Sequence, residues 1–185
     1  MKYILLFFLI FFNSCIVTPK YYLHTNKNLS DFKLQEQHKF VLIKNNFPVN
    51  FDQFSKRVND DFTSIINEIK ISHHFLELNT ENFFYHLNTE QLKIIKQESN
   101  SDFLILVQTL KKNSSKENKR EFHVVIQLID LNNENILYSK EAISEIKLTD
   151  DYSTISESEK GQLLKTYEKV FKDFKEEINS QRKLN

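Results

Sequence analysis

Three stretches of the chain place hydrophobic residues at the spacing of an amphipathic helix. The first stretch carries its stripe mostly at intervals of three and four residues and predicts a helix that follows Asn50. Asn50 can cap this helix while Gln53 reaches back from the third position, and Val49 can pack on Phe54 across the cap. The stripe consists of Phe51, Phe54, Val58, Phe62, Ile65, Ile66 and Ile69.

The second predicted helix is short and begins with the same kind of cap. Asn88 and Gln91 have the spacing of a capping box, and the helix runs from there to about Gln97. Serine and asparagine residues at positions 99–101 end it. The residues expected to face inward are Leu92, Ile94 and Ile95.

The third predicted helix closes the chain. Ser156 and Glu159 mark its start as another capping box, and an apolar stripe then continues over four turns. The opposite face is rich in Lys and Glu, with helix-stabilising spacings such as Glu168 to Lys172. The stripe consists of Leu163, Leu164, Tyr167, Val170, Phe171, Phe174 and Ile178.

Between these helices lie segments with the composition of β-strands. Residues 39–45 form a short run rich in branched side chains, and a second strand is expected around residues 73–79. Residues 102–107 are apolar almost without interruption, which predicts burial on both faces and therefore a central strand.

Residues 121–131 alternate between two faces, and residues 136–143 return after a turn at 132–135. This pattern predicts an antiparallel hairpin. One face of the first strand is expected to carry Phe122, Val124, Ile126 and Leu128. The other face is expected to carry His123, Val125, Gln127, Ile129 and Leu131.

The order of these elements predicts the class of fold. Strands and helices alternate in the first half, which favours parallel strands joined by right-handed crossovers, and the later hairpin adds antiparallel strands. We therefore expect one α/β (α+β) domain over residues 39–185, with a mixed sheet of about five strands and about three helices.

The start of the chain has the features of a lipoprotein signal. Lys2 precedes an unbroken apolar run at residues 4–12, which is much shorter than the roughly 20 residues that a spanning helix needs. The run ends at Cys15, the only cysteine of the chain. We expect residues 1–14 to be a signal peptide and Cys15 to be acylated, for example with palmitate. The alternative is an ordinary signal peptide followed by a free cysteine.

Residues 15–38 are expected to form the lipidated anchor and a tether. They show no sustained periodicity, and a linker here would let the domain stand off the membrane. Tyr21, Tyr22, Leu23 and Phe32 offer the alternative that this segment docks on the domain.

Composition and charge narrow the classes of function. The chain has 25 basic and 25 acidic residues, and its longest basic excess, around Lys111 to Arg120, is expected in a loop. A nucleic-acid binder needs a clustered excess of Lys and Arg, so we expect no nucleic-acid partner. With one cysteine, neither a disulfide framework nor a cysteine-based zinc site can form.

The sequence offers weak candidates for cofactor and metal binding. Its only glycine, Gly161, falls inside the last predicted helix, so no glycine-rich phosphate loop can be built. His73, His74 and Glu77 are the best metal-ligand candidates, although adjacent residues of a strand point to opposite faces. We predict neither a metal site nor a cofactor.

Other polar and aromatic clusters have simpler explanations than catalysis. Asp60 and Asp61 lie on the polar side of the first helix, and Asp150 and Asp151 belong to a loop. Residues 83–85 are Phe, Phe and Tyr, which fill a core more often than they form a contact patch. We expect the protein not to be an enzyme, with an unfamiliar active site as an open alternative.

Two stretches resemble a group of bacterial envelope proteins. Residues 101–106 (SDFLIL) are similar to the start of a central strand, and residues 125–131 followed by 133–139 (VIQLIDL, NENILYS) are similar to a hairpin of this group. The group includes penicillin-binding-protein activator lipoproteins, the curli secretion channel lipoprotein and the amino-terminal domain of the Tol-system periplasmic protein. The resemblance implies a small anticodon-binding-like α/β fold and brings no catalytic residues.

The resemblance also implies a role. It suggests an outer-membrane lipoprotein, facing the periplasm, whose domain is a non-catalytic module that binds another envelope protein. Residues 16–20 carry no acidic side chain, which favours the periplasmic face. The alternative is a self-assembling structural or secretion component that forms homo-oligomers through the same domain.

Overall fold

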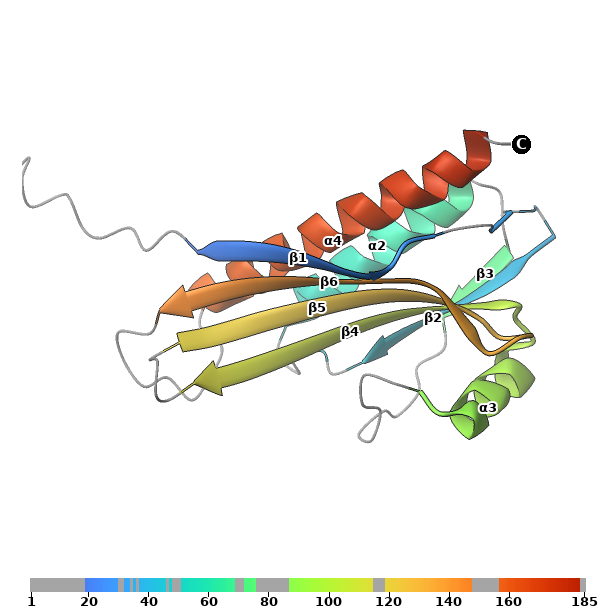
Figure 1. Cartoon of the computed structure of the whole chain (residues 1–185), viewed down its shortest axis with the longest axis horizontal. Helices are drawn as coiled ribbons and strands as arrows, with labels where there is room; N and C mark the ends of the chain where they lie inside the picture. Colours follow the sequence, from blue (N-terminus) through green and yellow to red (C-terminus); the bar gives the residue numbers. More distant parts are fainter. Residues whose placement is uncertain are drawn as a thin grey trace, which may run out of the picture.

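The computed structural model describes residues 19–29, 32–33, 35, 37–45, 47, 51–68, 72–75, 87–114, 119–147 and 157–183. It confirms an α/β fold with a mixed sheet and, in the described part, three helices (Figure 1). The elements are β1 (Lys20–Lys27), β2 (Lys39–Asn45), α2 (Asp52–Glu68), β3 (Ser72–Phe75), α3 (Thr89–Ser99), β4 (Phe103–Ser114), β5 (Lys119–Asp130), β6 (Asn135–Lys147) and α4 (Glu157–Lys183).

The sheet has the strand order β1-β6-β5-β4-β2-β3. β2 is parallel to β3 and β4, whereas β4–β5, β5–β6 and β6–β1 are antiparallel. The predicted parallel first half, the hairpin and the central position of β4 are therefore confirmed. No helix in the described ranges is long and apolar enough to cross a membrane.

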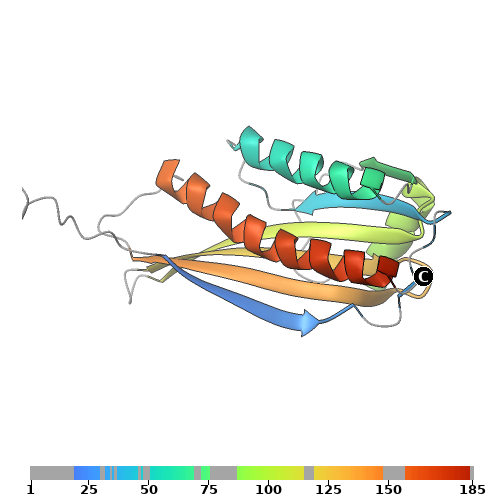
Figure 2. The same ribbon diagram turned by 90° about the horizontal axis from the view of Figure 1, so that it is seen from above.

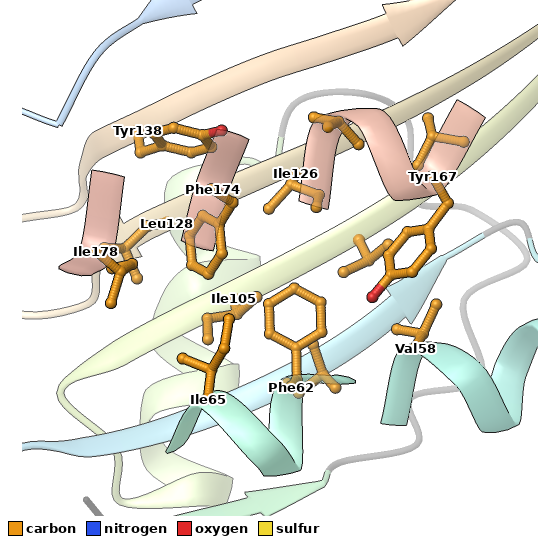
Figure 3. Close-up of a cluster of buried hydrophobic side chains, with 14 of the residues drawn as sticks. Val58, Phe62, Ile65, Ile105, Ile126, Leu128, Tyr138, Tyr167, Phe174 and Ile178 are labelled. Atoms are coloured by element: carbon orange, nitrogen blue, oxygen red, sulfur yellow. The ribbon is translucent and has the colours of Figure 1, made fainter. Parts of the chain in front are cut away.

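The main core lies between one face of the sheet and the helices α2 and α4, which run side by side (Figure 2). Phe62 of α2 and Phe174 of α4 contact each other with ring centroids 5.5 Å apart, and Tyr167 contacts Phe54 in the same way. Both predicted helical stripes supply this core, together with the alternating residues of β5 (Figure 3). The described residues of the two helical stripes and of this face of β5 therefore face the core, as their periodicity predicted.

A smaller core lies on the other face of the sheet, under α3. The predicted capping box of Asn88 and Gln91 is present, and the helix ends at Asn100, whose φ of 48° lies in the left-handed region. Leu92 and Ile95 are buried, but the expected inward position of Ile94 is wrong. A helix of three turns that rests on one face of a sheet buries only a narrow stripe, and Ile94, which is 50% exposed, lies off that stripe.

The β4–β5 hairpin is longer than the sequence predicted. The basic segment was expected in a loop, but β4 continues to Ser114 and β5 starts at Lys119. Lys112 pairs with Glu121 and Asn113 pairs with Arg120 in a continuous ladder. Backbone pairing with a long neighbouring strand outweighs the local charge, which by itself indicated a loop.

The sheet begins before residue 39. Residues 20–27 form β1, an edge strand that pairs with β6, and Leu29 and Phe32 are buried in the main core. Residues 20–27, Leu29 and Phe32 therefore pack on the domain, as the alternative to a tether predicted. β1 gave no sequence signal because all of its side chains except Tyr21 are exposed, so no burial pattern marks it.

Two aspartates fix the end of the sheet next to α3. The Asp102 carboxylate accepts a hydrogen bond from the Lys39 backbone at 3.0 Å. The Asp130 carboxylate accepts one from the Asn132 backbone at 2.8 Å and thereby closes the β5–β6 turn. In this turn the left-handed conformation falls on Glu134, with φ of 56°. Hydrogen bonds that the Asp130 carboxylate accepts from Asn132 and Asn133 stabilise this turn without a glycine.

Candidate functional site

Most of the residues singled out for chemistry lie apart from one another or outside the described residues. Cys15, Glu77, residues 83–85, Asp150 and Asp151 lie outside. His73 and His74 are neighbours in β3, opposite Phe40 and Val41 of β2. Within the described ranges, no three His, Cys, Asp or Glu side chains form a group that could hold a metal ion.

The acidic pair of α2 belongs to the surface of that helix. Asp60 is exposed, and Asp61 accepts a hydrogen bond from Arg57 Nε at 2.9 Å. Asp61 also lies near the Tyr167 phenol, whose pKa is raised by burial and by the negative charge of Asp61. A phenol with a raised pKa stays protonated at neutral pH, so Tyr167 itself is not a base in this arrangement.

The strongest candidate for a binding surface is the edge strand β1. Of the described large hydrophobic side chains, Tyr22 and Leu23 are exposed by 44% and 46%, and the other exposed one is Ile94. No described strand pairs with the outer edge of β1, so its free backbone groups offer a template for another strand. The opposite edge, β3, is only four residues long.

A groove runs between β1 and α4, and we call it the β1 groove. It has a volume of about 290 Å³. Lys169 Nζ lies 4.7 Å from the centroid of the Tyr21 ring, a cation–π distance that holds the tyrosine against the helix. The groove is lined by Tyr21, Tyr22, Leu23, Lys169, Lys172, Asp173 and Glu176.

Charge on β1 indicates what kind of strand can pair with its edge. Lys20, His24 and Lys27 belong to the strand, and it contains no carboxylate. Two copies of β1 side by side would bring like charges together, which destabilises cross-strand pairs. An extended segment that carries Asp or Glu would instead be attracted to this edge.

Buried and partly buried ion pairs hold α4 on the sheet and thereby fix one wall of the groove. Lys140 Nζ of β6 lies 2.6 Å from Asp173 and 3.3 Å from Glu177, and the Tyr138 hydroxyl donates to Asp173 at 3.0 Å. Burial by itself would lower the pKa of Lys140, but the two carboxylates outweigh it and raise the pKa. Near the start of α4, Glu159 forms a buried pair with Arg120 of β5.

The other face of the sheet carries a second polar cluster. His123 of β5 is buried, with its Nδ1 2.6 Å from Glu141 of β6 and its Nε2 3.2 Å from Glu121. A hollow of about 400 Å³ adjoins Glu141. It is lined by Asn26, Lys27, Val125, Gln127, Ile136, Ser139 and Glu141. The alternation in the sequence had placed His123 and Gln127 on this face, but only the pairing of β5 with β6 brings Glu141 next to His123.

The His123–Glu141 contact predicts a pH dependence of stability. The hydrogen bond and charge of His123 hold the pKa of Glu141 below its ordinary value of 4.5. The contribution of this contact to the free energy of unfolding is therefore complete above pH 4.5. It is lost as the pH falls through the lowered pKa of Glu141. We expect urea unfolding between pH 6 and pH 3 to show a shallower loss of stability for His123→Leu than for the unchanged protein. Equal slopes would contradict the contact, and Glu90→Gln on α3 serves as the control.

Comparisons with known proteins do not identify what this surface binds. No family model matches the sequence, and no curated protein matches it. Solved structures similar to the chain include a PelC dodecamer from Paraburkholderia phytofirmans, with 10% identity, a TM-score of 0.40, and coverage of 80% of this chain and 96% of that one. The lipoprotein GNA1162 from Neisseria meningitidis has 10% identity and a TM-score of 0.37, with coverage of 74% and 99%. At these scores the likenesses carry no argument about what this chain binds.

Proposed function

We propose that this protein is a lipid-anchored component of the bacterial envelope whose domain binds another envelope protein and catalyses no reaction. Acylation at Cys15 supplies the anchor, at the outer membrane and facing the periplasm. The domain supplies a docking surface made of the outer edge of β1 and the β1 groove.

The observation that supports the docking surface best is the exposed, aromatic and aliphatic edge strand. A long unprotected edge favours aggregation, and soluble proteins usually shorten or cover such edges. β1 keeps eight residues at the edge, with Tyr22 and Leu23 exposed beside a groove that can receive a side chain. Strand addition takes its affinity from backbone hydrogen bonds and its specificity from such side-chain sites.

The basic residues of β1 favour an acidic extended segment of another protein over a second copy of this chain. Lys20 and Lys27 lie near the two ends of β1, and His24 lies between them. Carboxylates of a partner strand can pair with these cations at the rim, where charge contributes to specificity and to the rate of association more than to affinity.

In-cell photocrosslinking tests the docking surface. A photoreactive residue in place of Leu23 is expected to link the protein to one other envelope protein. The same residue in place of Ile94 is the matched control, because Ile94 of α3 is equally exposed and lies away from β1. Lys27→Glu is expected to reduce the Leu23 crosslink severalfold, because Lys27 lies at the end of β1 that is farther from Cys15 and is opposite Ser139 of β6.

Three outcomes would contradict the proposal. Equal crosslinks from positions 23 and 94 would show that β1 has no special role. Crosslinks from position 23 to the protein itself, with a large uniform mass in mild detergent, would favour the self-assembling alternative. Absence of fatty-acid labelling, with no difference between the unchanged protein and Cys15→Ala, would exclude the lipid anchor.

A further inference from the structure

We infer that the β4–β5 hairpin end of the sheet faces the membrane, with Lys20 and Lys111 directed at lipid phosphates. This inference rests on the proposed anchor at Cys15. It concerns how the domain stands on the bilayer and is separate from the identity of any protein partner.

The first argument is the length of chain between the anchor and the sheet. β1 begins at Lys20, five residues after Cys15. Five residues span at most about 17 Å when fully extended. The start of β1 therefore stays close to the bilayer surface, whereas a tether reaching to residue 38 would have let the whole domain move away.

The second argument is the register of the strands. Lys20 of β1 is opposite Glu145 of β6, Glu145 is opposite Glu121 of β5, and Glu121 is opposite Lys112 of β4. These four residues form one row across the sheet. Because neighbouring strands are about 4.8 Å apart, Lys112 lies only about 14 Å sideways from Lys20. The short chain that holds Lys20 near the membrane therefore also brings the β4–β5 hairpin near the membrane, provided that the strands stand perpendicular to the bilayer.

The third argument is the charge at this end. The described carboxylates here have partners, since Glu145 pairs with Lys119, Glu159 with Arg120, and Glu121 with His123. Among the described residues, no ion pair joins Lys20 or Lys111 of this end to a carboxylate, whereas the charge of Lys112 helps to lower the pKa of Glu141.

The surroundings of Lys111 agree with an excess of positive charge. Burial and the neighbouring Arg120 lower the pKa of Lys111. Lipid phosphates within a Debye length, about 8–10 Å, would be attracted to these cations.

The remaining elements extend away from this end. β4 runs about 30 Å from Lys112 back to Phe103, and α4 is about 40 Å long from residue 157 to residue 183. Figure 1 shows α3 and the end of α4 at the opposite end of the sheet from the start of β1. An upright domain therefore places the β1 groove between the membrane and α3, within reach of a partner beside the lipoprotein.

The composition of the chain provides a clean probe for this orientation. The sequence contains no tryptophan, so a single introduced Trp is the only strong fluorophore of its kind. The Trp replaces either Lys112 in the hairpin or Lys93 of α3. Each acylated variant is then reconstituted into vesicles of phosphatidylcholine and phosphatidylglycerol that carry nitroxide-labelled headgroups. Both positions are exposed, and matching thermal melts show that each variant is folded.

We expect the fluorescence of Lys112→Trp to fall at least about twofold and that of Lys93→Trp to stay unchanged. The chain length holds Lys20 within about 17 Å of the anchor, and upright strands keep Lys112 at the same height above the bilayer as Lys20. Adding Lys20→Glu and Lys111→Glu is expected to weaken the quenching at position 112. Equal quenching at both positions, or none at position 112, would overturn the orientation. Unchanged quenching after the charge reversal would overturn the contact with phosphates.

A second sample separates this inference from the proposed anchor. Coupling the Cys15 thiol to a maleimide lipid attaches the protein to the same vesicles whether or not cells acylate it, and Cys15 is the only thiol of the chain. Quenching at position 112 in this sample supports the orientation even when fatty-acid labelling in cells fails. Failure of quenching in a protein that cells do acylate overturns the orientation and leaves the anchor intact.

Discussion

Replacing Glu159 by methionine is expected to lower the free energy of unfolding by about 3–5 kcal/mol. Its partner Arg120 has a side chain that is only 3% exposed, and Glu159 itself is 6% exposed. Removal of the carboxylate takes a buried, oppositely charged group away from a buried guanidinium whose Nε still donates to Asn113 at 2.9 Å. Chemical denaturation at pH 7 measures the loss.

The double variant gives this prediction its sharpest test. Arg120→Met with Glu159→Met removes both charges, so we expect stability to return to within about 1 kcal/mol of the unchanged protein. Arg57→Met is the matched control, because its pair with Asp61 lies on the surface of α2, and we expect a loss below about 1 kcal/mol. A double variant as unstable as Glu159→Met would contradict the loss of the buried Arg120–Glu159 pair as the cause.

Replacing Ile95 by alanine is expected to cost about 2–5 kcal/mol, because this side chain is 1% exposed in the smaller core under α3. The cost combines the lost burial of apolar surface with the cavity left between the helix and the sheet. Thermal or urea unfolding measures it.

The adjacent residue supplies the control within the same helix. Ile94 is 50% exposed, so Ile94→Ala makes the same chemical change and is expected to alter stability by less than about 0.5 kcal/mol. Similar losses for both variants would show that α3 packs on the sheet through a different face from the one described.

The candidate site was only partly predictable from the sequence. Tyr21, Tyr22 and Leu23 stood out as apolar residues after the proposed anchor, but β1 itself has no period because all of its side chains except Tyr21 are exposed. Strand periodicity arises when one face is buried, and an edge strand without a buried face leaves no such pattern. The groove also needs α4, whose residues lie about 150 positions further along the chain.

The sequence by itself determined the elements that bury a stripe or a face. The stripes of α2 and α4, the capping box of α3, the apolar β4 and the alternating β5 each follow from burial or local hydrogen bonding, which act within a few residues. The order of these elements along the chain in turn predicted a mixed sheet covered by helices.

Only the tertiary structure decided where charged residues meet. Arg120 and Glu159, or Lys140 and Asp173, are more than 30 positions apart, and nothing near either residue marks its partner. The same holds for the extension of β4 and β5 through a basic segment, and for β1 as the strand beside β6. Pairing between distant strands supplies hydrogen bonds that local propensity cannot reveal. For that reason the proposed docking edge, and the end of the sheet next to the proposed anchor, emerge only from the folded chain.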